Sequence, residues 1–358
     1  MKPLRVLHVP YSVGGNPQGL ARAERELGLE SVSVVFAPGP YAYEADEVLA
    51  EPGVGRLRYS LRRARLLARA LGQFDVIHFN FGRTLMPARL AYSDLPLLRR
   101  LGKTIAVTFQ GDDVRRGDVA RRLGGRSLPV VVPENYPASV DTERRRRVEA
   151  FDRHADLIFY LNPDLAHVLP ERARFMAYAH AAAPSEPPAE RGDGTFVVVH
   201  APSDRTIKGT AHVVAAVDAL RAEGVDVRLE LVEGLPNVEA RAAYARADVA
   251  VDQLNAGWYG GFAVEAMAAG TPVVAWIRDD DLGVLDQGMR EALPVVRADP
   301  DSLTSVLRDL LASGRPALHE LGRRSWSYVS EWHDPLRVAA AVTAAYEEAV
   351  ERKRGDAR

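Results

Sequence analysis

The sequence contains no cysteine, and this absence excludes disulfide bonds, thiolate zinc sites and cysteine nucleophiles. It has no run of about 18 apolar residues, so no transmembrane helix is expected. The apolar stretch at residues 4–9 is too short for a signal peptide. Lysine is scarce as well, with four (Lys2, Lys103, Lys208 and Lys353) among 46 basic residues. These absences favour a cytoplasmic protein, and they draw attention to Lys208, the lysine beside a glycine loop.

At 358 residues, the chain is long enough for two domains, each with its own core. Its apolar content of 47% and charged content of 26% are ordinary for a globular protein. The charge is unevenly divided: residues 1–180 carry 27 Lys and Arg against 20 Asp and Glu, whereas the remainder carries 19 against 28. This asymmetry indicates that the two halves meet different partners.

The first half opens with a strand, a glycine loop and a helix, as a nucleotide-binding type of α/β unit does. Residues 4–9 form the expected strand, Gly14 and Gly15 lie in the loop, and the helix runs from about Leu20 to Leu27. The glycine spacing is not that of a dinucleotide-binding loop, and the next strand does not end in an acidic residue for a ribose. These departures argue against a dehydrogenase. The loop is either a tight turn or part of a ligand site.

Two further strands of the first half end in polar side chains. One predicted strand ends at Asn80, and a second ends at Gln110 and continues into Asp112 and Asp113. Ligands of open α/β sheets gather outside the carboxyl ends of the strands, so these four side chains are expected at a ligand site. His78 precedes the first of these loops and is expected to be a packed strand histidine.

Residues 56–71 form a predicted helix with six arginines around a leucine stripe. A basic amphipathic helix can lie on an anionic membrane surface, and it is also the common pattern of a solvated face over a core stripe. The run Arg144–Arg147 points round a whole helical turn and is expected to be solvated. Nothing in the sequence resembles a nucleic-acid-binding module, so no nucleic-acid partner is expected.

Residues 181–194 are rich in Pro, Ala and Gly without periodicity, which indicates a linker. The alternation of strands and helices then restarts, so a second α/β domain is expected over 195–332. Its first strand leads into Arg205 and Lys208, just before a predicted helix from Thr210 to Ala222. Cationic side chains at a strand end can stabilise a departing phosphate, and a solvated loop is the alternative.

The most informative stretch begins with Gly260 and Gly261, runs into a helical pattern from Phe262, and stops at Gly270. A glycine pair before a helix lets a ligand approach the backbone, and the first-turn N–H groups and the helix dipole favour phosphate. Glu265 is expected in the first turn, where its carboxylate can cap the helix or reach a sugar hydroxyl. An ordinary α/β loop is the alternative interpretation.

This stretch resembles the C-terminal signature of the retaining GT-B glycosyltransferases of family 4, in which two glutamates eight positions apart flank a Gly-Phe-Gly-like loop. The match runs from Glu265 to Val273 and implies that Glu265 holds the ribose hydroxyls of a sugar nucleotide. The first glutamate of the pair falls at Gly257, so the family's contact to the donor sugar is missing. Asp252 or Tyr259 is a possible substitute.

The resemblance extends to other positions. Lys208 matches a lysine that grips the donor diphosphate in this family, and Arg205 matches its arginine partner less closely, two residues late. Gly14 and Gly15 match a loop on the other side of the cleft from that diphosphate. Gln110 stands where many family members have a histidine, and glutamine cannot exchange a proton near neutral pH.

The resemblance implies a GT-B fold, an α/β architecture of two Rossmann-like domains whose parallel sheets face a central cleft. Residues 1–180 are then the acceptor-side domain, 181–194 the linker, and 195–332 the nucleotide-sugar-binding domain. The final helix, from Pro335 to Arg352 within 333–358, is expected to cross back onto the first domain.

The implied reaction is transfer of a sugar from a nucleoside-diphosphate sugar to a hydroxyl of a small-molecule or lipid-linked glycan acceptor, with retention of anomeric configuration. No metal or other cofactor is required if cationic groups and helix amides neutralise the leaving phosphate. The expected roles are catalysis by Lys208, Arg205 and Asp112, donor binding by Gly14, Gly15, Gly260, Gly261, Phe262 and Glu265, and acceptor or sugar contacts by Asn80, Gln110 and Tyr259.

Two alternatives stay open at this point. A sugar-nucleotide epimerase on the same fold would use acid–base groups such as Asp112 and His200. A catalytically degenerate nucleotide-sugar-binding protein would account for Gly257 and Gln110 together. The protein is expected in the cytoplasm, with peripheral membrane contact through 56–71 as an open possibility.

Overall fold

In the computed structural model, the described part of the chain comprises residues 2–39, 43–184, 186, 189, 192 and 194–356, with the backbone alone for Asp356. It divides into two compact units, here called unit 1 and unit 2. Unit 1 contains the residues up to Arg116, Ala138–His180 and the residues from Pro335 onward, and unit 2 contains Gly117–Pro137 and Ala181–Asp334. Six residues of the predicted linker lie outside the described residues: Ser185, Pro187, Pro188, Glu190, Arg191 and Asp193.

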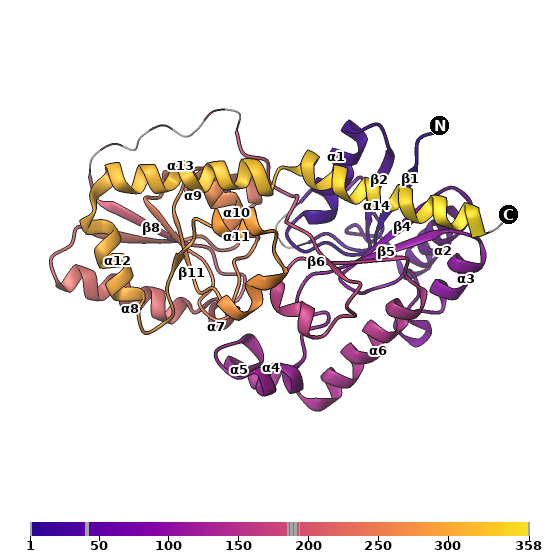
Figure 1. The fold of residues 1–358 in the computed structure, drawn as a ribbon, viewed down its shortest axis with the longest axis horizontal. Coiled ribbons are helices and arrows are strands. Elements are labelled where there is room, and N and C mark those ends of the chain that lie inside the picture. The colour runs from indigo at the N-terminus through magenta and orange to yellow at the C-terminus, as the bar shows by residue number, and fades with distance from the viewer. Residues whose placement is uncertain are drawn as a thin grey trace. The chain divides into compact units, whose positions relative to one another are not determined.

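Unit 1 is built on a parallel sheet with the strand order β3-β2-β1-β4-β5-β6-β7 (Figure 1). The central strands β4 and β5 are buried along their whole length, as expected of parallel strands with helices on both faces. The strands are β1 Arg5–Val9, β2 Glu30–Val35, β3 Glu47–Val48, β4 Val76–Asn80, β5 Thr104–Phe109, β6 Leu157–Tyr160 and β7 Arg174–Phe175.

Side chains alternate between the two faces of the sheet along each strand. Apolar side chains therefore lie on both faces, and helices cover them on each side. Leu7 and Ile77 pack into a core with α2, α3 and α6, whereas Val6 and Val76 pack into a second core with α1 and α14. The last helix of the chain therefore completes the core of unit 1 (Figure 1). The helical elements are α1 Asn16–Glu26, α2 Arg56–Gly72, η1 Ala88–Leu90, α3 Asp94–Arg100, α6 Ala138–His154, η3 Pro163–His167 and α14 Pro335–Asp356.

Unit 2 is built on a second parallel sheet, with the strand order β12-β11-β10-β8-β9. Valines of β8, β10 and β11 form its core with α8 and α12. The strands are β8 Phe196–His200, β9 Val227–Leu231, β10 Val249–Val251, β11 Val273–Ala275 and β12 Val296–Arg297. The helical elements are α7 Arg205–Lys208, α8 Thr210–Ala222, α9 Asn237–Arg246, α10 Gly261–Ala268, η4 Asp279–Val284, α11 Gln287–Glu291, α12 Leu303–Ala312 and α13 Gly314–Trp332.

Residues 117–137 belong to unit 2, although the sequence placed them within the first domain, 1–180. This segment, here called the strap, contains α4 Gly117–Leu123, α5 Leu128–Val131 and η2 Pro133–Asn135. Leu128, Val132 and Tyr136 of the strap pack against Ala256 and Ile207 in a small apolar cluster. The strap departs from the sequence-based domain division because its apolar side chains are buried on unit 2.

Two element boundaries differ from the sequence-based prediction. Helix α1 begins at Asn16, one turn before the predicted start near Leu20, because Pro17 occupies a first-turn position that tolerates proline. Helix α14 continues to Asp356, whereas the sequence placed its end near Arg352. In the part of the chain that the structure describes, no helix is both long and apolar enough to span a bilayer.

Candidate functional site

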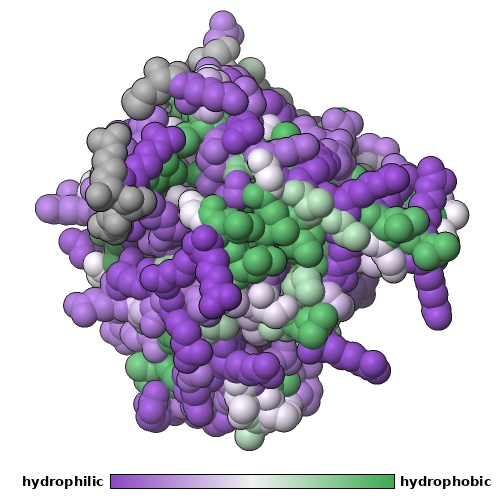
Figure 2. Space-filling view, turned by 90° about the vertical axis from the view of Figure 1, so that its right-hand side faces the viewer, coloured by the Kyte–Doolittle hydropathy of each residue, from purple (hydrophilic) through white to green (hydrophobic). Residues whose placement is uncertain are grey.

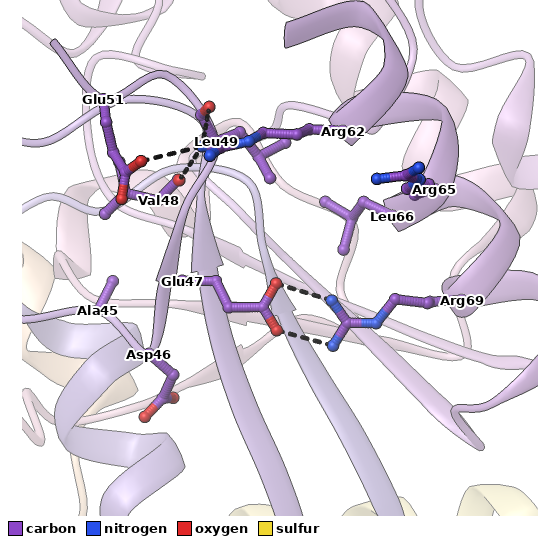
Figure 3. Close-up of a pocket in the computed structure, with 10 residues that line it drawn as sticks. All are labelled: Ala45, Asp46, Glu47, Val48, Leu49, Glu51, Arg62, Arg65, Leu66 and Arg69. Atoms are coloured by element: carbon purple, nitrogen blue, oxygen red, sulfur yellow. Dashed lines mark hydrogen bonds and ion pairs between the residues drawn. The ribbon is translucent and has the colours of Figure 1, made fainter. Parts of the chain in front are cut away.

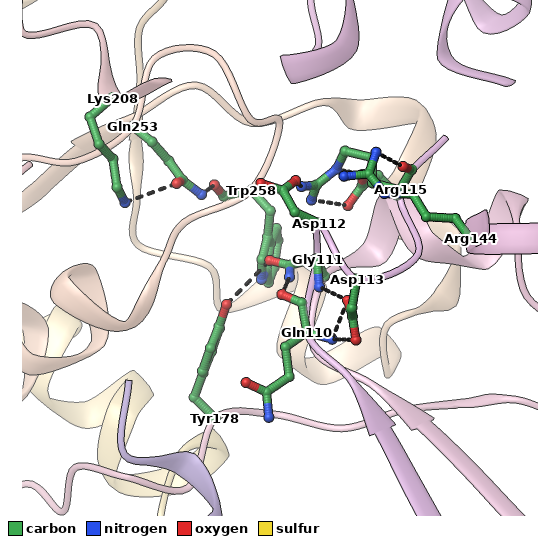
Figure 4. A network of polar contacts seen from close by, with 12 residues as sticks. Gln110, Gly111, Asp112, Asp113, Arg115, Arg144, Tyr178, Lys208, Gln253 and Trp258 are labelled. Carbon is green, nitrogen blue, oxygen red and sulfur yellow. Dashed lines mark hydrogen bonds and ion pairs between the residues drawn. The ribbon is translucent and has the colours of Figure 1, made fainter. Parts of the chain in front are cut away.

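The carboxyl edge of the unit 2 sheet gathers a lysine, a carboxylate and a glycine loop. The Lys208 ammonium, at the end of α7, donates to Asp252 Oδ1 and to Gln253 Oε1, both at 2.9 Å (Figure 4 shows the second bond). Asp252 Oδ2 accepts the Gly260 N–H at 2.6 Å. Asp252 is fully buried and directly follows β10, so this carboxylate ties the lysine to the loop that precedes α10.

The N-terminus of α10 lies against the Lys208 ammonium. A Cβ atom added to Gly260 would lie 3.1 Å from Lys208 Nζ and 3.4 Å from Asp252 Oδ2, so a side chain here would press on this cluster. Helix geometry leaves the amides of Gly261, Phe262 and Ala263 without intrahelical acceptors. An ammonium carries three N–H groups, and Asp252 and Gln253 engage two of them. The remaining donor, the free amides and the helix dipole together favour an anion at this place.

Glu265 lies in the second turn of α10 and not in the first turn, because the helix already begins at Gly261, one residue before Phe262. Its side chain is 4% exposed, and its Oε1 accepts a hydrogen bond of 2.7 Å from Asn237 Nδ2. The carboxylate of Glu265 is therefore fixed in position by Asn237 of α9.

Phe262, also predicted to bind the donor, packs its ring against Tyr244 with the centroids 4.7 Å apart.

Arg205, at the other end of α7, does not join the Lys208 cluster. Its guanidinium is 64% exposed and makes a two-pronged ion pair with Glu233, at 2.9 and 2.5 Å. The bond from Arg205 lowers the pKa of the Glu233 carboxyl below its usual value. The positive charge predicted at this position is thus already paired with a carboxylate.

His200, the second acid–base candidate of the epimerase alternative, is fully buried at the end of β8. Its Nδ1 lies 2.7 Å from the Val251 carbonyl oxygen and its Nε2 lies 3.0 Å from Thr210 Oγ1. Burial lowers the pKa of this imidazole below its usual value. His200 is a packed histidine with both ring nitrogens engaged, which does not suit a proton carrier for a substrate.

Gly257, where the resemblance expects a glutamate, has a left-handed backbone with φ of 76°. A Cβ at this position would lie 3.2 Å from Arg278 Cβ and 3.2 Å from the Trp276 ring. L-residues other than glycine rarely adopt this conformation. The loop is therefore built around glycine at the position where the family pattern has a glutamate.

The prediction that Tyr259 contacts a sugar is wrong in this structure. Tyr259 is fully buried, and its hydroxyl lies 2.9 Å from the Tyr328 hydroxyl and 2.8 Å from His333 Nε2. The Tyr259 side chain thus points into the core and stabilises, from the core side, the loop that precedes α10. Of the two substitutes considered for the missing glutamate, Asp252 alone lies beside Lys208.

In unit 1, Asn80 and Gln110 meet at the carboxyl edge of the sheet, with Gln110 Nε2 donating to Asn80 Oδ1 at 3.2 Å. The next turn is organised by Asp113, which accepts the N–H groups of Gln110 and Gly111 at 3.1 and 2.8 Å (Figure 4). Burial raises the pKa of Asp113 to about 6, against the opposing effect of these two amides and of the Arg147 charge. Asp113 therefore shapes the loop that carries Gln110.

Asp112 lies next to this turn, and its side chain is 43% exposed. It accepts a bond of 2.8 Å from Arg115, whose guanidinium also binds Asp164 at 2.6 and 3.1 Å. Asn162 Nδ2 donates to the Gln110 carbonyl oxygen at 2.6 Å and completes the network. Asp112 is thus held by an arginine while part of its carboxylate faces solvent.

Gly14 and Gly15 both have left-handed backbones, with φ of 61° and 71°, and they end directly at α1. The Tyr43 ring covers Gly15 so closely that no side chain fits there. The glycine loop is therefore a sterically required turn, whatever it binds.

His78 is fully buried in β4, with Nδ1 2.5 Å from the Tyr346 hydroxyl, as expected of a packed strand histidine.

Several residues of these two clusters were not singled out from the sequence: Gln253, Asn237, Asn255, Arg126 and Asn162. Gln253 directly follows β10, so the position of ligands beyond strand ends could have identified it. Asn237 and Arg126 reach their partners across 28 and 129 positions of the chain, and no local pattern signals such contacts. Among the described residues, no group of three or more His, Cys, Asp or Glu is arranged to hold a metal ion.

No protein-family model matches the sequence. A curated relative, the MMP α-(1→4)-mannosyltransferase of Mycolicibacterium hassiacum, is 30% identical over an alignment that spans 94% of this chain and 89% of the relative. An identity of this level over nearly the whole chain identifies a shared family.

Solved structures share the fold. Sucrose-phosphate synthase from Thermosynechococcus elongatus has a TM-score of 0.61 at 16% identity, and the match covers 96% of this chain and 98% of that one. HepE from Anabaena, solved in complex with UDP and glucose, has a TM-score of 0.60 at 12% identity and covers 96% and 100%. Two α/β units with parallel sheets and these neighbours confirm the predicted GT-B fold.

Proposed function

This chain belongs to the glycosyltransferase family of the MMP α-(1→4)-mannosyltransferase, and we propose that it transfers a hexose from a nucleoside-diphosphate sugar to an acceptor hydroxyl with retention of configuration. The name of the relative makes mannose the first donor sugar to test. Retention and the nucleotide donor rest on the resemblance of Glu265–Val273 to the retaining enzymes of family 4.

The observation that supports this proposal most strongly is the position of Lys208 at the N-terminus of α10. When the bond between the sugar C1 and the phosphate oxygen breaks, the leaving diphosphate gains negative charge. Preorganised donors aimed at that charge stabilise the transition state more than the ground state. Lys208 and the amides of Gly261 and Phe262 are such donors. In this proposal they hold the two phosphates.

The other residues keep the roles that the resemblance suggests. Glu265, fixed by Asn237, would accept hydrogen bonds from the ribose hydroxyls. Asn80 and Gln110 of unit 1 would contact the acceptor or the transferred sugar. Asp112, at the same polar carboxyl edge of the sheet, would keep its catalytic role. Arg205 would contribute only after exchanging Glu233 for a phosphate.

We also propose that the transfer needs no divalent metal, because the lysine and the helix amides supply the positive charge that a metal would otherwise bring. Treatment with EDTA should leave the rate unchanged. A loss of activity that Mg²⁺ or Mn²⁺ restores would contradict this part of the proposal.

The direct experiment is incubation with a panel of nucleoside-diphosphate hexoses, with and without oligosaccharide acceptors, followed by NMR of the products. We expect release of the nucleoside diphosphate and an α-linked product from an α-linked donor. Interconversion of the donor into an isomer would instead indicate an epimerase. Thermal stabilisation without turnover would indicate a nucleotide-sugar-binding protein.

Lys208→Ala tests the site within the same assay. Loss of the ammonium should lower kcat/KM by about tenfold or more, since a single charged contact to the transition state is worth at least about 1.4 kcal/mol. Arg308→Ala is the control, because Arg308 makes an exposed ion pair with Glu223 elsewhere in unit 2. If Lys208→Ala and Arg308→Ala had equal kcat/KM, Lys208 would not belong to the site.

A further inference from the structure

One segment of unit 1 is far more basic than the chain as a whole. Residues 52–103 carry eleven Lys and Arg against two Asp and Glu, within a chain whose formal net charge is −2. This segment contains α2, η1 and α3. Figure 2 shows hydrophobic surface between hydrophilic side chains on the side of the molecule where Figure 1 places α2 and α3.

The same elements expose large apolar side chains. Leu57 and Leu61 of α2 are 76% and 52% exposed, and Leu90, Leu97 and Leu101 of the η1–α3 region are 53%, 42% and 52% exposed. Exposed arginines surround them: Arg56, Arg58, Arg65, Arg89, Arg99 and Arg100. We call these eleven side chains the basic face. Leucines exposed to this degree and clustered among arginines mark an interaction surface.

The two parts of the basic face lie on the same side of the sheet. Leu66 and Ala70 of α2, and Leu95 and Leu98 of α3, pack into one hydrophobic core. Arg63 of α2 donates to the carbonyl oxygen of Leu85, just before η1, at 2.6 Å. Both helices follow parallel strands, so their N-terminal ends lie at the carboxyl edge of the sheet. Leu57, Leu61 and Leu90 therefore gather near that edge.

The arginines of α2 that face the sheet are already paired within the protein. A pocket of about 460 Å³ lies beside β3 and is drawn in Figure 3. There Arg62 bonds Glu51 at 3.1 Å, and Arg69 bonds Glu47 at 2.7 and 2.8 Å. Arg65 lies between them on the helix, and it is exposed. The inward arginines serve the fold, whereas Arg56, Arg58 and Arg65 of α2 are exposed.

We propose that the basic face docks on an anionic membrane surface, with Leu57 and Leu61 inserted among the acyl chains and the arginines at the phosphate headgroups. A helix with arginines beside exposed leucines binds at such an interface through both charge and apolar burial. Nucleic acid would satisfy the arginines but would leave the leucines in water, so it fits the face less well. This inference does not depend on the sugar or the acceptor.

Vesicle co-sedimentation of the full chain tests the proposal. Vesicles containing phosphatidylglycerol should bind the protein at least about tenfold more tightly than pure phosphatidylcholine vesicles, and raising the salt from low to about 0.5 M should weaken the binding. Leu57→Gln with Leu61→Gln should weaken binding by about tenfold, through loss of apolar burial. Arg56→Gln with Arg58→Gln should weaken it to a similar degree.

Matched controls come from unit 2. Val238→Gln removes a side chain that is 80% exposed, and Arg241→Gln with Arg324→Gln removes two exposed arginines from α9 and α13. These variants should bind vesicles as the wild type does. No binding to anionic vesicles would overturn the proposal. So would equal binding of the leucine variants and the wild type, or binding to duplex DNA that exceeds binding to vesicles and is unaffected by the leucine changes.

Discussion

At the scale of single residues, Asp252 gives the most definite expectation, because its two carboxylate oxygens serve two different donors. Oδ1 accepts from Lys208 and Oδ2 accepts from the Gly260 amide. Asn in place of Asp has one acceptor and one donor, so one of these contacts must become repulsive. Asp252→Asn should lower the free energy of unfolding by about 3 kcal/mol, as expected when a buried ion pair loses one partner.

Chemical denaturation at pH 7 measures this change, and Asp218→Asn is the control. Asp218 makes an exposed ion pair with Arg221 at 3.1 Å in the same unit, and its loss should cost less than about 1 kcal/mol. Equal costs for the two variants would show that Asp252 does not organise the Lys208 site.

The raised pKa of Asp113 predicts that the stability of unit 1 depends on pH. Burial raises the pKa of Asp113 to about 6 in the folded protein, from its usual value of 3.8. Between these values the folded state retains a proton that the unfolded state loses, so this group's contribution to stability is greatest below about pH 4. It falls by about 3 kcal/mol as the pH rises through 6. The difference in unfolding free energy between wild type and Asp113→Asn should decrease over that range, and a constant difference would contradict the assigned shift.

At the scale of the elements, the sequence predicts those whose signals are local. The range predicted for α8, Thr210 to Ala222, is the observed one, since a glycine precedes the helix and an apolar pattern fills it. The start of α1 is missed because Pro17 and Gly19 indicate a loop. In the structure Gly19 packs against the Ala179 backbone, a contact that no local pattern shows.

The strap is the element that the sequence could not place. Arg126 donates to Asn255 Oδ1 at 3.2 Å across 129 positions of the chain. Asn255 Nδ2 in turn bonds the carbonyl oxygens of Thr206 and Ile207, at 3.2 and 3.3 Å. The candidate site residues Lys208, Gly260 and Glu265 were predicted from strand-end and glycine signals and from the family resemblance, whereas this support for α7 depends on tertiary contacts alone.

Asn255→Ala tests this support. It should weaken binding of the nucleoside diphosphate that the donor assay identifies by about tenfold, because Lys208 directly follows the two carbonyls that Asn255 holds. Calorimetric titration measures the affinity. Arg126→Ala should have a smaller effect in the same direction, and little further effect in the double variant. Unchanged affinity in Asn255→Ala would mean that α7 holds its conformation without this residue.

The loop before α10 predicts the effect of restoring the family's glutamate. Gly257→Glu should lower stability by about 1–2 kcal/mol, because φ is 76° and a Cβ would press on Arg278 and Trp276. It should not raise turnover. Gly257→Ala is the control, because it adds the Cβ and the backbone strain without the carboxylate. Thermal melting and kcat measure the two effects, and a rise in kcat without loss of stability would show that the loop accepts the carboxylate.

At the scale of the whole molecule, each unit has its own sheet and core, and the chain passes through both more than once. Unit 1 is completed by α14, whose Tyr346 hydroxyl lies 2.5 Å from the buried His78. Tyr346→Phe should therefore destabilise unit 1 by about 1–2 kcal/mol, through the unpaired imidazole nitrogen.

Hydrogen exchange measures this effect unit by unit. Amides of β4 and β5 should exchange faster in Tyr346→Phe, whereas amides of β8 and β10 should keep their rates. Tyr11→Phe, at a residue that is 41% exposed in unit 1, is the control and should change neither set. Equal acceleration in both sheets would show that the two units unfold together.

The central claim is that Lys208 and the N-terminus of α10 hold the diphosphate of a sugar nucleotide. A crystal structure of the protein with the nucleoside diphosphate released in the donor assay tests it most directly. The account predicts phosphate oxygens within about 3.2 Å of Lys208 Nζ and of the Gly261 or Phe262 amides. Phosphates bound elsewhere, with Lys208 still paired to Asp252 and no ligand at α10, would contradict it.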